Sequence, residues 1–450
     1  MEGADRSWLR SDGGARLTAL REQTRDMAKF DAQAVSNTAH AMAKLDLWGT
    51  AWECLWKELE GAALARSLND FGPQELANTA WAFATAGHAA PSLFDAIGRE
   101  SAGRVCEFKS QELSNTAWAF ATAGHAAPAL FDAIGEEAAG RVCELVPQAL
   151  ANTAWAFAKA GHAAPALFNA IGREAAGRVR ELNPQNLANT AWAFATAGRA
   201  THALMDAVAE ESAGRVRKFA PQALANMAWA FATAGHAAPA LFDAIEREAA
   251  GRVRELNPQN LCSMAWAYAV LDHLPAQSSL FDQRFAHHCD ALSHEFNSLD
   301  LRQLHQWRLW YASERACSDA LPGAALLARC DAMFRSEKAR PSLLQRDVAN
   351  ALASLGVSVQ EEKVLEEGYS LDLVVDCGGG KLIAVEVDGP SHFVGREPTG
   401  ATLLKRRQLK HFGWRLVSVP YWEWGGLAHP DKSKEREQRA AYLKALLSEE

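Results

Sequence analysis

The feature that most constrains the fold is an internal repeat with a period of 37 residues. The segment "ELANTAWAFATAGHAAPSLFDAIGRE", which begins at residue 75, returns as "ELSNTAWAFATAGHAAPALFDAIGEE" and then as "ALANTAWAFAKAGHAAPALFNAIGRE". One position serves as an anchor and is occupied in turn by Asn78, Asn115, Asn152, Asn189, Asn226 and Ser263. Asn37 marks a divergent earlier copy, and Gln306 marks a decayed eighth copy. Similar inner copies with divergent ends are typical of a stacked array whose terminal repeats face water.

Each copy predicts two helices joined by a short loop. In the second copy, Pro73 begins the first helix, called helix A, Gly87 ends it, and Pro91 begins helix B. Proline is tolerated at the first helical position, and glycine is favoured just after the last one. We therefore predict a right-handed α-solenoid of about eight helix pairs. It would span residues 30–335, after an N-terminal extension of residues 1–29.

The arc of helix A that carries the anchor is expected to be the open face. Helical spacing puts Glu75, Thr79, Ala82 and Thr85 on the same arc as Asn78, and several of these positions vary between copies. A constant amide beside varying neighbours is how a protein would read one base per repeat of single-stranded RNA, with a footprint of about eight nucleotides. The predicted RNA-binding anchors are Asn78, Asn115, Asn152, Asn189 and Asn226.

Two readings of these positions stay open at this point. The anchor asparagines would also suit a structural ladder, in which each amide bonds the backbone of the next repeat. A tryptophan series lies three residues after the anchor, and its place on the opposite arc predicts core packing rather than stacking on bases. This series comprises Trp81, Trp118, Trp155, Trp192, Trp229 and Trp266.

Charge and composition exclude several classes of protein. The formal net charge is −8, and residues 73–257 contain 15 Lys and Arg against 18 Asp and Glu. RNA binding by the repeats would therefore depend on hydrogen bonds and stacking more than on attraction to phosphate. No apolar run approaches the ~18 residues of a membrane span. The sequence contains no C-x-x-C pair of the kind that binds zinc. The N-terminus shows no clear organellar leader, because acidic residues interrupt it.

Residues 336–450 have a different pattern and predict a separate domain. Helices are expected over 341–356, 401–413 and 432–447, and strands over 357–368, 369–377, 381–389 and 414–424. The resulting order, αβββαβα, is that of a restriction-endonuclease-like fold. The expected fold class is thus an α-solenoid followed by a small α/β domain.

Three carboxylates interrupt the hairpin "SLDLVVDCGGGKLIAVEVDG". Pairing its strands about Gly379 places Asp372 opposite Glu386, with Asp388 one step along on the same side. Like charges that face each other repel, and a divalent cation such as Mg²⁺ or Mn²⁺ would relieve the repulsion. These three residues are the candidate catalytic set, with Asp372 and Glu386 as metal ligands. The alternative is a solvated sheet face with no metal.

The C-terminal residues also resemble a known family. "LDLVV", "IAVEVDGPSHF", "LLKRRQL", "GWRLVSVPYWEW" and "YLKALL" look like a RAP domain, an RNA-binding module that is itself similar to PD-(D/E)XK nucleases. The "NTAWAFATAGH" copies resemble heptatricopeptide and octotricopeptide repeats, which accompany RAP domains in FAST kinase-like proteins. The resemblance implies RNA processing, RNA stability or rRNA maturation in a mitochondrion or chloroplast, on organellar mRNA or rRNA.

The resemblance leaves the chemistry of the domain open. It places metal ligands on Asp372 and Glu386, but Asp388 stands where the nuclease motif has lysine, so a domain that grips RNA is favoured over an active metal-dependent endoribonuclease. His392 or Lys405 would otherwise handle the proton. The residues expected to contact RNA here are Lys405, Arg406, Arg407, Lys410 and Tyr421, with Trp422 and Trp424 nearby. A protein-binding scaffold, with protein partners instead of RNA, is the remaining alternative.

Overall fold

The computed structural model describes residues 27–50, 52–273, 280–314, 321–336, 341–378 and 381–448. The chain divides into two compact units, called unit 1 (Met1–Val208) and unit 2 (Ala209–Glu450). Most of the predicted N-terminal extension lies outside the described residues. The domain boundary predicted at residue 335 falls between two helices of unit 2 and stays a prediction.

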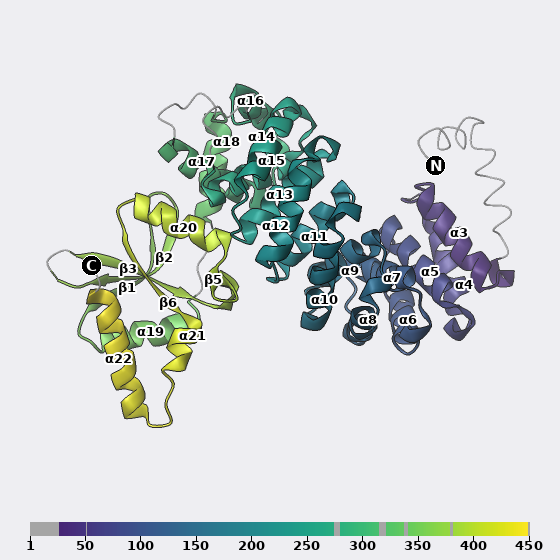
Figure 1. The fold of residues 1–450 in the computed structure, drawn as a ribbon, viewed down its shortest axis with the longest axis horizontal. Coiled ribbons are helices and arrows are strands. Elements are labelled where there is room, and N and C mark those ends of the chain that lie inside the picture. The colour runs from purple at the N-terminus through teal and green to yellow at the C-terminus, as the bar shows by residue number, and fades with distance from the viewer. Residues whose placement is uncertain are drawn as a thin grey trace. The chain divides into compact units, whose positions relative to one another are not determined.

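Unit 1 is built from helix pairs, as the repeat predicts (Figure 1). Successive A helices pack on one another in one layer, and successive B helices pack in a second layer. The A helices are α3 (Ala32–Lys44), α5 (Pro73–Ala86), α7 (Ser110–Ala123), α9 (Pro147–Ala160) and α11 (Pro184–Thr196). The B helices are α4 (Glu53–Leu64), α6 (Pro91–Ala102), α8 (Pro128–Gly140) and α10 (Pro165–Gly177), while α12 (His202–Ala213) spans the division between the units.

The helix boundaries follow from proline and glycine. Pro73 and Pro91 occupy the first positions of α5 and α6, as predicted. Gly87 ends α5 with φ 63°, a left-handed conformation that glycine adopts without steric cost. Helix B of this copy is short, since α6 ends at Ala102 and a 3-10 turn follows at Val105–Glu107.

Arginine and histidine side chains join one repeat to the next. Arg141 Nη1 donates to the carbonyl oxygen of Phe108 at 3.0 Å, and Arg104 and Arg178 make the equivalent bond one repeat before and one repeat after. His125 Nε2 lies 2.8 Å from Asp95 Oδ1 of the preceding B helix. These regular polar contacts, together with the buried alanine and phenylalanine side chains, hold the stack in register.

Unit 2 continues the helix pairs and ends in a mixed α/β domain (Figure 1). The helix pairs are α13 (Pro221–Thr233) with α14 (Pro239–Gly251), α15 (Pro258–Leu271) with α16 (Gln283–Ala291), and α17 (Ser298–Glu314) with α18 (Ala324–Arg335). The α/β elements are α19 (Leu343–Ala353), β1 (Ser358–Val364), β2 (Ser370–Asp376), β3 (Leu382–Asp388), β4 (Phe393–Val394), β5 (Glu397–Pro398), α20 (Gly400–His411), β6 (Arg415–Pro420), α21 (Tyr421–Gly426) and α22 (Lys432–Ser448).

The order αβββαβα is confirmed, with the small β4–β5 hairpin and α21 as additions. The four-stranded sheet has the order β1-β2-β3-β6, in which β3 and β6 are parallel and the other pairs are antiparallel. The prediction of one strand over 414–424 was wrong, since β6 ends at Pro420 and a helix begins at Tyr421. Proline has no N–H to continue the ladder, and its φ of −67° suits the entry to a helix.

Both faces of this sheet are covered. On one face, Leu352 of α19, Trp424 of α21 and Leu443 of α22 pack on the strands. On the other face, Leu409 of α20 packs on the strands together with Leu309 and Phe334 of the last helix pair. The sheet therefore shares a core with the repeats of its own unit. Among the described residues, we find no helix with the length and apolar character needed to span a bilayer.

Candidate nucleic-acid interface

A groove of about 430 Å³ runs along the A helices of unit 1. Amides from three successive repeats line it, and each repeat contributes an anchor asparagine and a glutamine one helical turn earlier. These pairs are Gln111 with Asn115, Gln148 with Asn152, and Gln185 with Asn189. The groove thus presents the same pair of amides again and again along its length.

The anchor asparagines are half-buried, including Asn78 and, in unit 2, Asn226. Asn115 Oδ1 accepts a hydrogen bond from Gln111 Nε2 of its own helix at 2.9 Å. In the described part of unit 1, the polar links between successive repeats include the arginine and histidine contacts described above and the bond from Ser114 Oγ to the carbonyl oxygen of Ala149. The bond that the Asn115 amide accepts, by contrast, lies within its own helix. This placement favours the prediction that the anchor asparagines contact RNA bases over the prediction that they form a structural ladder.

The tryptophan series differs from the prediction. Trp81 and Trp118 line the groove, and the rings from Trp81 to Trp192 are half-buried rather than in the core. Their centroids follow one another at 6.4, 6.3 and 6.1 Å. Residues three apart share one face of a helix, so the tryptophan three residues after each anchor faces the same groove as the anchor. The small alanines of the A helices pack closely and leave no room for an indole between them. In unit 2, Trp266 is buried, as predicted.

A second correction concerns the position that follows the anchor. Thr79 was expected on the open face, but it and its equivalents are buried, as is Ala82. These equivalents are Thr116, Thr153, Thr190, Met227 and Met264. Their side chains lie within the packed layer of A helices, so the change from threonine to methionine alters packing rather than the surface of the groove.

A row of glutamines beside the anchors was not predicted from the sequence. Gln74, Gln111, Gln148, Gln185, Gln222 and Gln259 recur four residues before the anchor. The available signal was this constancy combined with the i, i+4 spacing, which places glutamine and asparagine on one face of the helix. The groove therefore has two amides per repeat rather than one.

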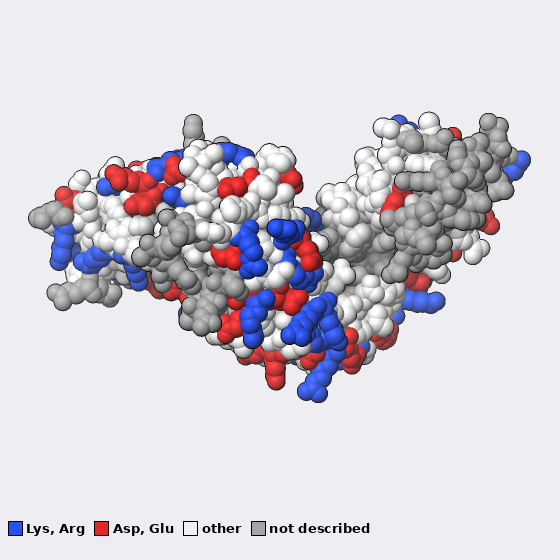
Figure 2. Space-filling model, turned by 90° about the horizontal axis from the view of Figure 1, so that it is seen from above, with Lys and Arg blue, Asp and Glu red and all other residues white. Residues whose placement is uncertain are grey.

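The groove is nearly neutral. Lys44 and His40 are the ionisable residues that line it. Burial, and then the nearby Lys44, lower the pKa of His40. Lys44 Nζ lies 5.1 Å above the ring of Trp81, where the cation and the ring attract. Figure 2 shows basic and acidic side chains interspersed rather than a single basic surface. Such a groove can bond base edges and stack on rings, with little attraction to phosphate.

The carboxylates of the C-terminal hairpin form a second candidate site. The observed pairs Leu373–Val385 and Asp376–Leu382 confirm the predicted strand register, although Gly379 lies outside the described residues. The side chain of Asp372 accepts a hydrogen bond from the backbone N–H of Val387 at 2.8 Å. The register thus brings Asp372 to the end of β3 where Glu386 and Asp388 lie.

Cationic side chains from α20 balance these carboxylates. Lys405 Nζ lies 2.5 Å from Glu386 Oε2, and Arg406 Nη2 lies 2.6 Å from Asp388 Oδ2. His392 Nδ1 lies 3.1 Å from Asp388 Oδ1. The described residues contain no group of three or more His, Cys, Asp or Glu side chains arranged for a metal. Metal binding by Asp372 and Glu386 stays a prediction.

The pKa values of the three carboxyl groups shift in different directions. Burial raises the pKa of Glu386 to about 7, although Lys405 opposes the shift, and Glu386 Oε1 is buried without a hydrogen-bond partner. Burial also raises the pKa of Asp372. Burial acts on Asp388 in the same sense, but hydrogen bonds from His392, Ser418 and Arg406 outweigh it and lower the pKa of Asp388. The carboxyl of Glu386, whose pKa is about 7, therefore lies beside the ionised carboxylate of Asp388.

Replacing Lys405 with methionine should destabilise the sheet in a pH-dependent way. The raised pKa of Glu386 means that the folded state binds its proton more tightly than the unfolded state, so stability falls as pH rises from about 4.5 towards 7. Without Lys405 the pKa rises further, and breaking this buried pair costs about 3 kcal/mol at pH 8. At pH 5 the loss should be small, because Glu386 is then protonated in both proteins. Hydrogen-exchange protection of β3 amides at the two pH values measures the difference.

The matched control adds Glu386→Gln to the Lys405→Met variant. The double variant should lose the extra pH dependence, since no buried carboxylate remains to be ionised at this position. Equal destabilisation by Lys405→Met at pH 5 and pH 8 would contradict the assigned ion pair.

The other residues expected to contact RNA have varied surroundings. Arg407 binds the backbone carbonyl oxygens of Ala269 and Val270 at the end of α15. The side chain of Lys410 is exposed at the last turn of α20. Tyr421 is exposed on α21, where its ring meets that of Trp422. Lys405, Arg406 and Arg407 thus make contacts within the protein, and their role in RNA binding stays a prediction.

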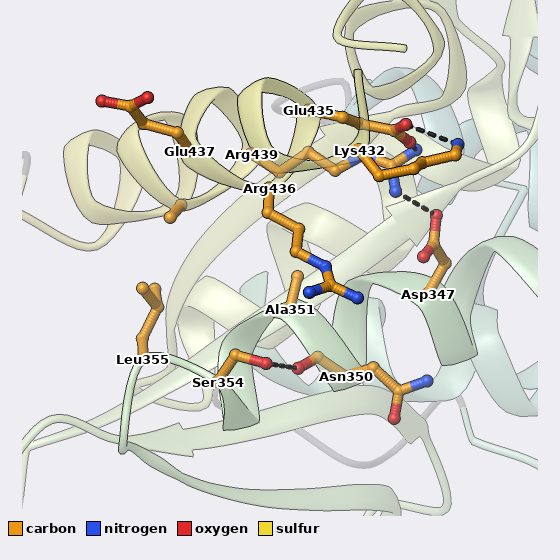
Figure 3. Close-up of a pocket in the computed structure, with 11 residues that line it drawn as sticks. Asp347, Asn350, Ala351, Ser354, Leu355, Lys432, Glu435, Arg436, Glu437 and Arg439 are labelled. Atoms are coloured by element: carbon orange, nitrogen blue, oxygen red, sulfur yellow. Dashed lines mark hydrogen bonds and ion pairs between the residues drawn. The ribbon is translucent and has the colours of Figure 1, made fainter. Parts of the chain in front are cut away.

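A hollow of about 810 Å³ lies between α19 and α22 (Figure 3). Arg439 Nη1 pairs with Asp347 Oδ2 across it at 2.9 Å, and Arg439 Nη2 pairs with Glu435 at 2.9 Å. Lys432 pairs with the same glutamate, and Arg436 reaches into the hollow between the two helices. None of these residues was predicted from the sequence to form a site. The paired charges tie α22 to α19.

Comparisons with known proteins cover both parts of the chain. Residues 385–446 match the family described as RAP domain, and this segment contains Glu386, Asp388 and α20. Residues 19–197 match the family described as RNA-editing substrate-binding complex 6 protein, and this segment contains the groove. A segment of 89 residues is 39% identical to a protein of Oryza sativa subsp. japonica described as "RAP domain-containing protein, chloroplastic". The match spans 19% of this chain and 13% of the rice protein.

Proposed function

We propose that this chain, which carries a RAP domain near its C-terminal end, binds single-stranded RNA in the groove of unit 1. The observation that carries the proposal is the row of paired amides beside stacked tryptophans. The segment that resembles an RNA-editing substrate-binding protein contains this groove, which supports RNA as the ligand.

The chemistry of the groove suits bases rather than phosphates. An amide offers a donor and an acceptor side by side, and the edge of an unpaired base offers the complementary pair. Indole rings provide surfaces on which any base can stack. Because the amide pair is the same in three successive repeats, we expect weak discrimination along this stretch and a preference for RNA of repetitive sequence.

The RAP domain would hold an adjacent segment of the same RNA. We propose a role in organellar RNA processing, RNA stability or rRNA maturation. The rice relative is described as chloroplastic, which supports an organelle as the location, either chloroplast or mitochondrion.

A second candidate function is metal-dependent RNA cleavage at Asp372, Glu386 and Asp388. The buried Glu386 Oε1 without a hydrogen-bond partner favours it, because such an oxygen is free to bind an ion. Incubating RNA with the protein in Mn²⁺ or Mg²⁺ tests it, with Glu386→Gln as the matched variant. Cleavage that Glu386→Gln abolishes would support this candidate, and equal cleavage by both proteins would eliminate the site.

Replacing Asn115, Asn152 and Asn189 together with alanine tests the main proposal. Each lost amide bond is worth about 0.5–1.5 kcal/mol, so the triple variant should bind single-stranded RNA about a hundredfold more weakly. The melting temperature should stay within a few degrees. Binding of a short oligonucleotide that occupies the groove alone should also depend weakly on salt, with a slope of log K against log salt of about −1, since Lys44 is the cation that lines the groove.

Asn169→Ala is the matched control, because this asparagine is exposed on helix α10 and does not line the groove. It should leave RNA affinity unchanged. A triple variant with normal affinity and a much lower melting temperature would show that the anchors are structural. Crosslinking that recovers protein partners but no nucleotides would favour a protein-binding scaffold.

A further inference from the structure

We infer that the repeats of α15 and α17 do not read RNA, because the C-terminal domain docks on them. The inference rests on the proposed function, and it replaces the footprint of eight repeats expected from the sequence. All the contacts that support it lie within unit 2.

The anchor of the last repeat is occupied by the protein itself. Gln306 Nε2 donates to the hydroxyl of Tyr369 at 3.0 Å, and Gln306 Oε1 accepts from Trp266 Nε1 at 2.9 Å. The backbone oxygen of Gln306 accepts from Gln408 Nε2 of α20 at 2.9 Å. Tyr369 also bonds Gln408 Oε1. The amide that would meet a base in this repeat therefore has both of its ends engaged.

The preceding helix, α15, departs from the repeat where the domain docks. Its anchor is Ser263 instead of asparagine, and its tryptophan, Trp266, is 6% exposed and bonded to Gln306. Val270 replaces the polar residue of most other copies and is 2% exposed. Asp272 replaces the stop glycine and adopts φ 55°, and its carboxylate accepts from Trp310 Nε1. With these departures, the surface of α15 suits docking of the C-terminal domain rather than contact with RNA bases.

Helix α20 completes the docking against α13 and α15. A Cβ on Gly400 would lie 1.8 Å from the carbonyl oxygen of Ala232 and 2.6 Å from Val270 Cγ1, so the two backbones meet without a side chain between them. Arg407 binds the last carbonyls of α15, where the negative end of the helix dipole attracts a cation, and it lies 3.5 Å from the Asp272 carboxylate. The C-terminal domain therefore packs directly against these repeats through close backbone contacts and hydrogen bonds.

The remaining anchors are Asn37, Asn78, Asn115, Asn152, Asn189 and Asn226. At one base per repeat, the repeats of α15 and α17 contribute no base contacts, so the footprint is smaller than the roughly eight nucleotides expected from the sequence. Asn152, which lines the groove of unit 1, and Gln306 thus occupy equivalent anchor positions but serve different partners, RNA for the first and the C-terminal domain for the second.

A matched pair of full-length variants tests this division. Asn152→Ala, in the groove of unit 1, should weaken binding of single-stranded RNA about tenfold and leave amide exchange in α17 and α20 unchanged. Gln306→Ala should leave RNA affinity unchanged and raise amide exchange in α17 and α20.

One result would overturn the inference while the proposed function stands. It is a loss of RNA affinity in Gln306→Ala as large as in Asn152→Ala, with amide exchange unchanged. If the wild-type protein binds no single-stranded RNA, the proposed function itself fails, and the inference fails with it.

Discussion

Replacing Trp81, Trp118 and Trp155 together with leucine is expected to weaken binding of single-stranded RNA by about three orders of magnitude. Stacking of a base on an aromatic ring is worth about 1–3 kcal/mol, and three rings are lost at once. Leucine keeps an apolar side chain on each A helix, so the layer of buried alanine and phenylalanine beneath it should remain packed. The variant therefore removes the indole rings from the groove but keeps the packed layer of alanine and phenylalanine beneath them.

The measurement is a fluorescence anisotropy titration of the variant with labelled single-stranded RNA, together with its melting temperature. Trp48→Leu is the matched control, because this indole is 39% exposed in the same unit and does not line the groove. It should bind RNA like the wild-type protein. A folded triple variant with affinity within twofold of wild type would show that the tryptophan row does not contact RNA.

Gly400→Ala is expected to destabilise unit 2 by about 3 kcal/mol, although alanine is the better helix former. At an open helical position this substitution would stabilise by several tenths of a kcal/mol. At residue 400 the new Cβ would overlap the carbonyl oxygen of Ala232, a backbone atom that cannot move aside as a side chain can. The helices α13 and α20 must then separate, and the buried contacts between them are lost.

Hydrogen exchange of α13 and α20 amides measures this separation. Gly425→Ala is the control, since a Cβ there meets nothing within 4 Å and φ is not in the left-handed region. The control should match or slightly exceed the stability of the wild-type protein. If Gly400→Ala behaves like Gly425→Ala, then the packing of α20 on α13 is not as close as the structure has it.

The sequence predicted what depends on local pattern. Proline and glycine gave the helix boundaries in each copy, and alternation gave the strand register that brings Asp372 near Glu386. Helical spacing also placed the anchor asparagines together on one face. These features depend on residues a few positions apart, and such residues are visible in one copy of a repeat.

Spacing alone could not predict which arc of helix A the neighbouring repeats would cover. Thr79 and Trp81 lie on opposite sides of the anchor around the helix. The close approach of alanine-rich helices decides that threonine is buried and tryptophan faces the groove. The repeat pattern shows which residues are constant, but it does not show how near the next helix lies.

The contacts of the C-terminal domain were also beyond local pattern. Arg407 was expected to meet RNA, yet it binds a carbonyl more than a hundred residues away in the chain. Lys405 and Arg406 were also expected to contact RNA, and their pairing with Glu386 and Asp388 follows only from the fold. The departures of Val270 and Asp272 from the repeat were visible in the sequence, but only the docked helix α20 explains them.

Ultraviolet crosslinking of the full-length protein to single-stranded RNA, followed by mass spectrometry of the peptides, tests most directly whether the groove is the RNA site. We expect nucleotide adducts on the A helices α5, α7, α9 and α11, at or beside Trp81, Trp118, Trp155 and Trp192. Adducts confined to the B helices or to residues 336–450, with none on the A helices, would contradict the assignment of the groove.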